Sequence, residues 1–365
     1  MEFVCNGGDL VNAFKIMGGA VNDKATNPIM SCIKLDVRDN SIFMCTTNGD
    51  ISIKGKIDAN VVEEGCCVAD FITFNALLKG LERETITFET KDNTLRANYA
   101  GSKFSLQLAN AEDFPNINTA KVEEKFKIGA NALKNLINNG GMAVATDDSR
   151  PILKGVLFEN SGNEISAVSL DGFRLMRVKE NTEHVYSNIK MVIPSSAFSP
   201  INKLLEMSND DILVEGNDNA VIFCIDNYEI NARLLNGNFI EYQKIIPTTF
   251  ATEVILSKPQ LLMALQRSLQ LVKTHSNNFV SLNITDDYLA VNARSEIGDL
   301  QEKIIAQVNG NGLLISFNAK FLVEFLKNCN DDYVKLLLNQ SYTPCVIKGI
   351  DNDNYTYLVL PVRQA

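Results

Sequence analysis

The chain has little of what marks membrane, secreted or metal-binding proteins. No window of its 365 residues approaches the run of roughly 18 apolar residues that a membrane span requires. The first residues lack a basic start followed by a long apolar run, so we expect no secretory signal, no membrane partner and a cytoplasmic location. Only two histidines occur and no Cys-x-x-Cys is present, so we expect no metal site and no cofactor.

The eight cysteines are scattered along the chain, and most of them lie in apolar runs. Cys66 and Cys67 are adjacent, which is poor geometry for a disulfide between them. We therefore expect buried, reduced cysteines that act as small apolar residues.

Catalytic motifs are missing as well. The sequence has no Gly-x-x-x-x-Gly-Lys-Ser/Thr phosphate loop, no Gly-x-Ser-x-Gly elbow and no His-Glu-x-x-His. Paired carboxylates stand in turn-rich segments, at Glu63-Glu64, Asp147-Asp148, Asp210-Asp211, Asp286-Asp287 and Asp331-Asp332. Acid–base catalysis needs carboxylates in a pocket with separated pKa values, so we expect solvated pairs and no catalytic residue. An enzyme of unknown class stays an alternative, and it predicts a deep polar pocket with perturbed carboxylates.

What the sequence does contain is a repeat. One amphipathic helical pattern, opened by Gly or a capping residue, occurs at residues 7–16, 129–137 and 257–265. A second pattern, led by a phenylalanine, occurs at residues 74–79, 198–205 and 321–327. The leading phenylalanines are separated by 124 and 123 residues. Two helix types that recur in the same order at one period indicate a unit present three times.

The segments between the helices alternate apolar and polar residues. Residues 85–89 and 95–99 alternate around a turn at Asp92-Asn93, and residues 281–285 and 288–292 alternate around Asp286-Asp287. Such alternation predicts antiparallel meanders with one solvated face. We therefore expect an α+β fold of three domains, residues 1–122, 123–248 and 249–365, without loose linkers.

The net charge of −10, taken alone, argues against nucleic acid, because phosphate contacts rely on Lys and Arg. The helical windows 7–21, 70–82, 129–145, 195–208, 257–275 and 318–329 nevertheless contain nine basic residues and five acidic ones. If the helices share one surface, that surface is basic within an acidic body. An ordinary lysine-bearing solvated surface is the alternative.

Several segments in the expected order resemble the bacterial sliding clamp, the beta subunit of DNA polymerase III. They are residues 146–158 (TDDSRPILKGVLF), 169–175 (SLDGFRL), 234–247 (LLNGNFIEYQKIIP) and 357–363 (YLVLPVR). Residues 104–106 (FSL) with 113–116 (DFPN) resemble the end of its first domain. The resemblance covers the whole chain.

This resemblance implies a non-catalytic DNA polymerase processivity factor. Three DNA-clamp domains, each with two helices and antiparallel sheets, would form a crescent, and two crescents would close into a homodimeric ring around double-stranded DNA. The helices would line the bore and contact DNA weakly, without sequence preference. The DNA-facing residues would be Lys24, Lys79, Lys134, Lys203, Arg267, Lys273 and Lys327. A divergent relative that serves as a non-DNA interaction platform is a further alternative.

The family also implies a peptide-binding pocket between domains 2 and 3, an apolar groove with a basic rim that suits Leu or Phe anchors. The implied partners are the polymerase III catalytic subunit, the clamp loader and other proteins with a clamp-binding motif. The matching residues are Leu153, Leu170, Gly172, Phe173, Arg174, Leu175, Ile240, Lys244, Ile245, Leu358, Leu360, Val362 and Arg363. Because Leu170, Ile240 and Lys244 stand where the family commonly has Thr, Pro and Arg, the peptide preference stays open.

A ring of this kind has a seam where domain 1 of one subunit meets domain 3 of the other. Phe104 and Leu106 match one side of the family's seam, and Leu271 matches the other. Pairing strand edges that would otherwise be exposed is a physical reason to dimerise.

Overall fold

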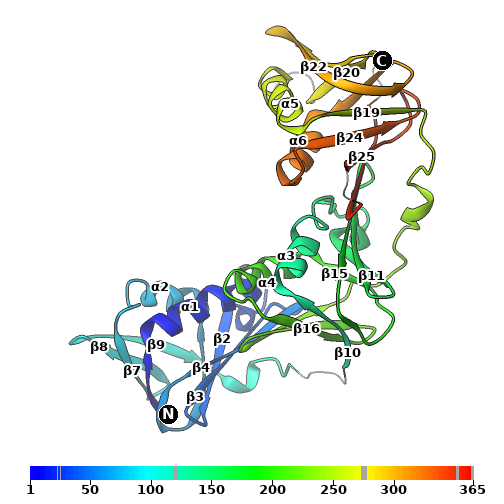
Figure 1. The fold of residues 1–365 in the computed structure, drawn as a ribbon. Helices are drawn as coiled ribbons and strands as arrows, with labels where there is room; N and C mark the ends of the chain where they lie inside the picture. Colours follow the sequence, from blue (N-terminus) through cyan, green and yellow to red (C-terminus); the bar gives the residue numbers. More distant parts are fainter. Residues whose placement is uncertain (23, 25, 118–121, 273–277, 351–352, 363–365) are drawn as a thin grey trace. The chain divides into compact units, whose positions relative to one another are not determined.

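The computed structural model describes all residues except 23, 25, 118–121, 273–277, 351–352 and 363–365. The chain folds into two compact units (Figure 1). Residues 1–134 and 182–236 form the first unit, and residues 135–181 and 237–365 form the second. Each unit is an antiparallel sheet with helices packed on it, as the alternating and helical patterns predicted.

The first unit contains α1 (Gly7–Met17), α2 (Phe71–Leu78) and α4 (Phe198–Leu205). Its strands are β1 (Glu2–Asn6), β2 (Cys32–Arg38), β3 (Ser41–Thr47), β4 (Ile51–Asp58), β5 (Asn60–Glu63), β6 (Gly65–Asp70), β7 (Thr85–Lys91), β8 (Thr94–Tyr99), β9 (Ser102–Ala109), β10 (Glu123–Gly129), β14 (His184–Val185), β15 (Lys190–Pro194), β16 (Asp211–Gly216), β17 (Ala220–Ile225) and β18 (Tyr228–Arg233). All but β15 form one sheet in the order β14-β10-β16-β17-β18-β4-β3-β2-β6-β9-β8-β7-β1-β5.

The second unit contains α5 (Lys258–Val272) and α6 (Ala319–Asn328), and α3 (Ala130–Asn138) runs from the first unit into it. Its strands are β11 (Gly155–Ser161), β12 (Glu164–Leu170), β13 (Arg174–Asn181), β19 (Thr252–Ser257), β20 (Phe279–Ile284), β21 (Tyr288–Ser295), β22 (Gly298–Gly310), β23 (Leu313–Asn318), β24 (Tyr333–Leu338), β25 (Cys345–Gly349) and β26 (Tyr355–Val359). They are ordered β11-β12-β13-β26-β25-β24-β19-β22-β21-β20-β23.

The six predicted helices are all present, and polar caps explain where several begin. The Asn6 side chain accepts the backbone N–H of Gly8 at 2.7 Å, and Asp70 accepts that of Thr73 at 2.8 Å. Asn318 does the same for Lys320 at 3.0 Å. Each cap satisfies an amide that has no partner within its own helix. The strand before each helix therefore ends where the capping side chain stands.

The helices of the first unit lie along one face of its sheet (Figure 1). A Cβ added to Gly19, just after α1, would stand 2.6 Å from Cβ of Pro200 in α4, so the two helices meet too closely for a side chain there. Lys203 of α4 also donates from Nζ to the carbonyl oxygen of Lys15, near the end of α1, at 3.1 Å. These contacts join the first and second copies of the repeat within one unit.

Candidate functional site

The predicted peptide pocket centres on one end of the sheet of the second unit. Leu170 of β12 pairs with Leu175 of β13, and Leu175 pairs with Leu358 of β26. Directly opposed residues of antiparallel strands point to the same face, so the three leucines form one apolar row. None of the three is more than 4% exposed, so the row is buried at this end of the sheet.

A tight loop between β12 and β13 places an aromatic side chain beside this row. Asp171 Oδ1 accepts the backbone N–H groups of Phe173 at 2.9 Å and of Arg174 at 3.0 Å. Gly172 has a φ of 91°, a conformation that favours glycine. The loop leaves the Phe173 ring 63% exposed, so Phe173 is available as an apolar contact.

The C-terminal tail follows the same loop. The backbone N–H of Leu360 donates to the Phe173 carbonyl at 2.8 Å, and that of Val362 donates to the Ser316 carbonyl of β23 at 2.8 Å. Both tail side chains are half-buried. Backbone bonds thus hold Leu360 against the loop and Val362 against β23. Arg363, the last predicted residue of the pocket, lies outside the described residues.

Arg174 is anchored within the protein. Its Nε donates to Asp171 at 3.0 Å, its Nη1 donates to Glu324 of α6 at 2.6 Å, and its guanidinium lies 4.5 Å from the centre of the Phe321 ring. Burial alone would lower the pKa of Arg174, but Tyr357 and then the carboxylates of Glu324 and Asp171 raise it, so the group stays charged. Lys244 is likewise ion-paired with Glu241. The predicted basic rim is therefore largely neutralised among the described residues.

The connector that contains Ile240, Lys244 and Ile245 is fixed by a tyrosine. Tyr242, in a 3-10 turn (Tyr242–Lys244), is 1% exposed and donates its hydroxyl to Glu159 of β11 at 2.5 Å. Burial, followed by the Glu159 hydrogen bond, raises the pKa of this hydroxyl. The anchored turn leaves Ile245 39% exposed.

The remaining pocket residues are less accessible. Ile240 is half-buried, and Leu153, in the turn Pro151–Lys154 before β11, is 3% exposed. No local pattern marks Glu159 or Glu324, because each is distant in the chain from the residue that it anchors.

The predicted DNA-facing cations differ in their availability. Lys24, Lys79 and Lys327 are exposed, and Lys134 is half-buried. Lys203 is exposed but donates to the helix carbonyl described above. Arg267 of α5 makes a two-pronged ion pair with Glu302 of β22, with Nε to Oε1 at 2.5 Å. Lys273 lies outside the described residues.

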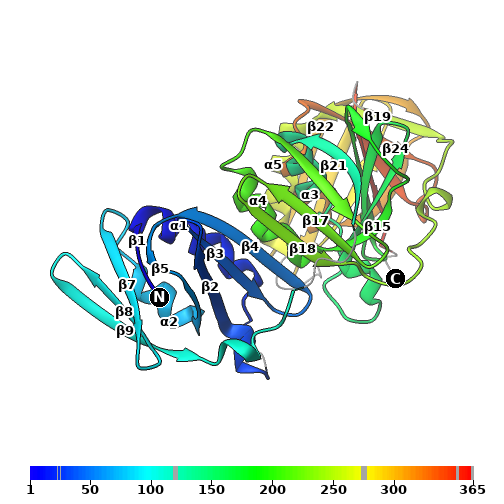
Figure 2. The same ribbon diagram turned by 90° about the horizontal axis from the view of Figure 1, so that it is seen from below.

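The predicted seam residues lie beside strand edges that have only one neighbour. Over the described chain, residues 102–107 of β9 pair only with β8, and residues 298–305 of β22 pair only with β21. Leu106 is buried, and Phe104 lies 6.4 Å from both Phe74 and Phe88, ring centre to ring centre. Leu271 is half-buried and lies beside the first residue of β22, since a Cβ on Gly298 would stand 4.0 Å from it. Figure 2 shows β7, β8 and β9 side by side at one end of the first unit.

One expectation about the cysteines is wrong in part. All eight are free thiols, but Cys66 is exposed, and Cys45 and Cys224 are only half-buried. Cys66 lies on β6 with its side chain on the outer face, whereas Cys67 points to the core. Alternation along an exposed strand explains the difference.

The geometry of an acid–base centre is not visible in the described part of the chain. The resolved carboxyl pKa shifts are downward: hydrogen bonds from Ser149 lower the pKa of Asp147, and ion pairs with Arg267 and Lys348 lower those of Glu302 and Asp353. No group of three or more potential metal ligands is found among the described residues. Within the same residues, no helix is long and apolar enough to cross a membrane.

Solved structures with the same fold define the class of the protein. The chain is similar to the DNA polymerase sliding clamp of Bacillus subtilis, with a TM-score of 0.96, 26% identity and full coverage of both chains. It is also similar to a putative DNA polymerase III beta subunit of Eubacterium rectale, with a TM-score of 0.95 and 27% identity over both full chains. The fold is that of a sliding clamp with three clamp domains.

Sequence comparison names the family. Models of the N-terminal, central and C-terminal domains of the DNA polymerase III beta subunit match residues 1–118, 127–241 and 243–363. The beta sliding clamp of Staphylococcus epidermidis is 26% identical over 100% of this chain and 99% of its own length. That of Staphylococcus aureus is 27% identical over 94% of each chain.

The chain therefore belongs to the DNA polymerase III beta subunit family. This family is the sliding clamp, a processivity factor and a non-catalytic accessory subunit of the polymerase, and this is the role of the chain.

Proposed function

We propose that two copies of this chain close head to tail into a ring around double-stranded DNA, each copy with clamp domains at residues 1–122, 123–248 and 249–365. The ring is inferred from the strand pairs that connect successive copies of the repeat. β4 pairs with β18, and β13 pairs with β26. The two strands that would make the next join of this kind are β22 and β9.

The period of the repeat supports this assignment. β4, β13 and β22 begin at residues 51, 174 and 298, and β9, β18 and β26 begin at residues 102, 228 and 355. Each series advances by one period, and the first two joins use one strand from each series. β22 and β9 remain, each with the one-sided edge described above. Joining β22 of one copy to β9 of the next would satisfy both edges, and two such joins would close a dimer.

A seam variant tests the dimer. Leu271→Lys puts a charge beside the start of β22, whereas Met263→Lys, on an exposed position of the same helix, is the matched control. Sedimentation velocity should give a dimer for the parent chain and for the control, and a monomer for Leu271→Lys. A parent chain that sediments as a monomer at replication-relevant concentrations would contradict the ring.

The DNA contact is proposed to come from exposed helix lysines, weakly and without sequence preference. Lys79 and Lys327 are the best candidates, because both are exposed at the C-terminal end of a helix. The clamp should be loaded onto a nicked circle by a clamp loader, and the circle should then be linearised. A ring stays on the circle and leaves the linear DNA. Equal retention on both forms would refute topological binding and favour a non-DNA interaction platform.

The peptide pocket is proposed at the leucine row and its flanking residues, for the polymerase III catalytic subunit, the clamp loader and other proteins with a clamp-binding motif. Phe173 is exposed beside the buried leucine row, and Ile245 is exposed on the connector; both side chains suit contacts with apolar peptide anchors. The double variant Leu360→Ala/Val362→Ala keeps the backbone bonds of the tail but removes its apolar surface. It should lose polymerase stimulation and keep DNA retention. Loss of both would contradict a separate pocket.

Replication partners place the protein beside chromosomal DNA, so we propose a cytoplasmic location. Family membership supports DNA and a polymerase as partners, together with self-association.

A further inference from the structure

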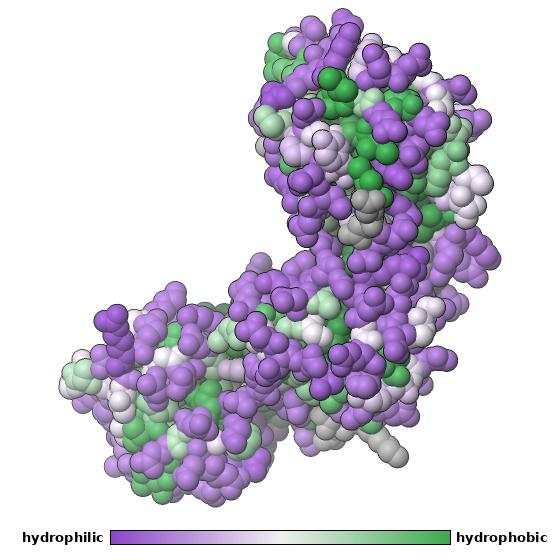
Figure 3. Space-filling model, in the orientation of Figure 1, coloured by the Kyte–Doolittle hydropathy of each residue, from purple (hydrophilic) through white to green (hydrophobic). Residues whose placement is uncertain are grey.

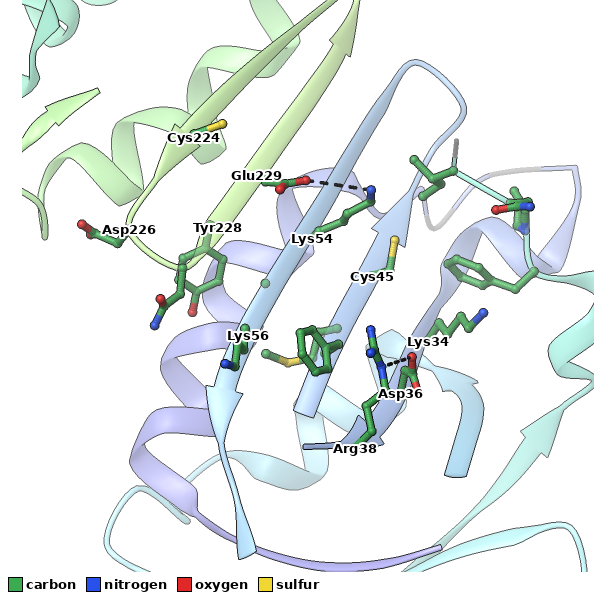
Figure 4. A pocket seen from close by; sticks show the side chains of 18 residues that line it. Lys34, Asp36, Arg38, Cys45, Lys54, Lys56, Cys224, Asp226, Tyr228 and Glu229 are labelled. Carbon is green, nitrogen blue, oxygen red and sulfur yellow. Dashed lines mark hydrogen bonds and ion pairs between the residues drawn. The ribbon is translucent and has the colours of Figure 1, made fainter. Parts of the chain in front are cut away.

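The sheet of the first unit carries a groove of about 900 Å³ on the face opposite its helices (Figure 4). Gly55 of β4 points toward α1, since a Cβ there would stand 3.3 Å from the sulfur of Met17. Lys54 and Lys56 therefore point to the other face. β2, β3, β4 and β18 form the floor of the groove, and residues 114–117 form a wall.

Two cross-strand rows run over this floor. One row places Lys34, Cys45, Lys54 and Glu229 side by side, and the other, two residues along, places Asp36, Phe43 and Lys56 side by side. The apolar residues of both rows stand on β3, at the centre of the groove. The charges stand on the strands to either side of β3.

Some of the basic side chains that line the groove are in ion pairs and others are not. Arg38 pairs with Asp36 at 3.1 Å, and Lys54 pairs with Glu229 at 3.9 Å. Lys34 and Lys56 make no ion pair within the described part of the chain. Two cations without an ion pair thus face one groove in a chain whose net charge is −10. One carboxylate of the lining, Asp226, also has no ion pair among the described residues and accepts a hydrogen bond from Ser208. An occupant with one negative charge at Lys34 and one at Lys56 would complement these two cations.

The spacing of the two free lysines restricts the occupant. Lys34 and Lys56 are two strands apart and offset by two residues, which separates their backbones by about 12 Å. In an extended peptide, the side chains of residues i and i+4 point to one side and are about 13 Å apart. The residue between them, i+2, would meet Phe43 and Cys45 on the central strand.

The apolar centre suits such a peptide as well. The Phe43 ring is half-buried, with the Arg38 guanidinium 4.4 Å and the Lys56 ammonium 5.6 Å from its centre. The Lys56 ammonium makes no ion pair among the described residues, so its N–H groups are available to an anion, whereas Arg38 is already paired with Asp36 and Asp39. Phe114 and Ile117 add an apolar wall.

We propose that this groove binds an extended acidic segment of another protein, in which two carboxylates flank one apolar side chain. The site belongs entirely to the first unit, whereas the leucine row belongs to the second. The proposal therefore does not depend on the ring or on the peptide pocket.

The probe is a fluorescent peptide centred on Asp-Ala-Leu-Ala-Asp, and its control is the same peptide with Asn for Asp. Anisotropy with the full chain should show binding of the acidic peptide that weakens as salt is raised, and roughly tenfold weaker binding of the control. Lys34→Gln/Lys56→Gln should also weaken binding roughly tenfold, because two exposed charge contacts are lost. Lys190→Gln, an exposed lysine on β15, should leave binding unchanged.

A charge swap separates direct contact from misfolding. Lys34→Glu/Lys56→Glu should bind a Lys-Ala-Leu-Ala-Lys peptide that the parent chain does not bind. Absence of this gain would overturn the proposal, as would equal binding of the Asp and Asn peptides or unchanged affinity in the Lys34→Gln/Lys56→Gln variant. Lysine-dependent binding of an oligo(dT) strand without binding of the acidic peptide would overturn it in favour of a nucleic acid site.

Discussion

Replacing Arg174 with methionine should loosen the loop that presents Phe173 while keeping much of the side-chain volume. Methionine retains an apolar stem over the Phe321 ring but loses both ion pairs. Asp171 keeps the two backbone N–H groups that it accepts. The loop should therefore keep its turn but lose its tie to α6.

The size of the effect follows from the exposure of each partner. The side chains of Arg174 and Asp171 are 10% and 15% exposed, so their charge-assisted bond contributes roughly 1.5–2 kcal/mol. Glu324 is 47% exposed, and solvent screening reduces the contribution of its ion pair with Arg174 to about 0.5 kcal/mol. The contact with Phe321 adds about 0.5–1 kcal/mol. The local cost is about 3 kcal/mol, or roughly a hundredfold in an opening equilibrium.

Hydrogen exchange measures this opening directly. The Leu360 amide is bonded to the Phe173 carbonyl, so its exchange rate reports how often the loop and tail separate. Arg174→Met should speed this exchange roughly a hundredfold, and Glu324→Gln should speed it only about twofold. Amides of the first unit serve as internal references.

An exchange rate at Leu360 that rises less than about fivefold in Arg174→Met would refute the reasoning. It would mean that the arginine is free to serve a bound peptide rather than holding the loop. An equally large rise in Glu324→Gln and in Arg174→Met would contradict the assignment of most of the stabilisation to the Arg174–Asp171 ion pair.

Three further outcomes are expected. Tyr242→Phe should destabilise the connector by about 1 kcal/mol, because Glu159 loses its hydroxyl donor, and exchange at Ile245 should measure it. Lys79→Gln should reduce the slope of log affinity for DNA against log salt by up to about one, whereas Lys190→Gln should not. Burial raises the thiol pKa values of Cys67 and Cys345 from 9.0 to about 12, so the folded state holds these protons more tightly than the unfolded state. Their stabilising effect is complete below the ordinary thiol pKa and is lost as pH rises toward 12, so melting temperatures should fall between about pH 8 and pH 10.5, and less steeply in Cys345→Ala.

The helices and hairpins were predictable because their signals are local. The two helical patterns found α1 to α6, and the Asp92-Asn93 turn found β7 and β8, with positive φ angles at both turn residues. Caps such as Asn6 and Asp70 can be recognised from neighbours in the sequence. The order of strands across a sheet was not predictable, because partners such as β4 and β18 are separated by about half the length of the chain.

The register of the second unit brings part of the predicted peptide site together, and the charge partners of that part were not predictable. Leu170, Leu175 and Leu358 came from family motifs, and the register places them in one row. The basic rim was overestimated because the partner of Arg174 is Glu324, which is 150 residues away. No spacing rule reveals a pair of that kind before the sheet is built.

The basic groove was not found from the sequence for a similar reason. Lys34, Phe43 and Lys56 come from three strands, and Glu229 comes from the next copy of the repeat. The helical windows of the first unit lie on the other face of the same sheet. Much of the visible surface is hydrophilic in Figure 3, so a hydrophilic surface does not by itself mark a site. Lys34 and Lys56 stand out only once the ion-pair partner of each charge is known.

The unequal use of three similar copies follows from how their sheets are joined. An interface between two unlike edges closes into a ring or continues as an open filament, depending on the rotation from one copy to the next. In this chain the second copy pairs its strand β18 with the first copy and its strand β13 with the third. Only β9 and β22 keep one-sided edges of this series in the described chain, one in the first copy and one in the third. These two unlike edges are the pair that the proposed head-to-tail ring would join, and the sedimentation experiment tests whether the joins close after two chains.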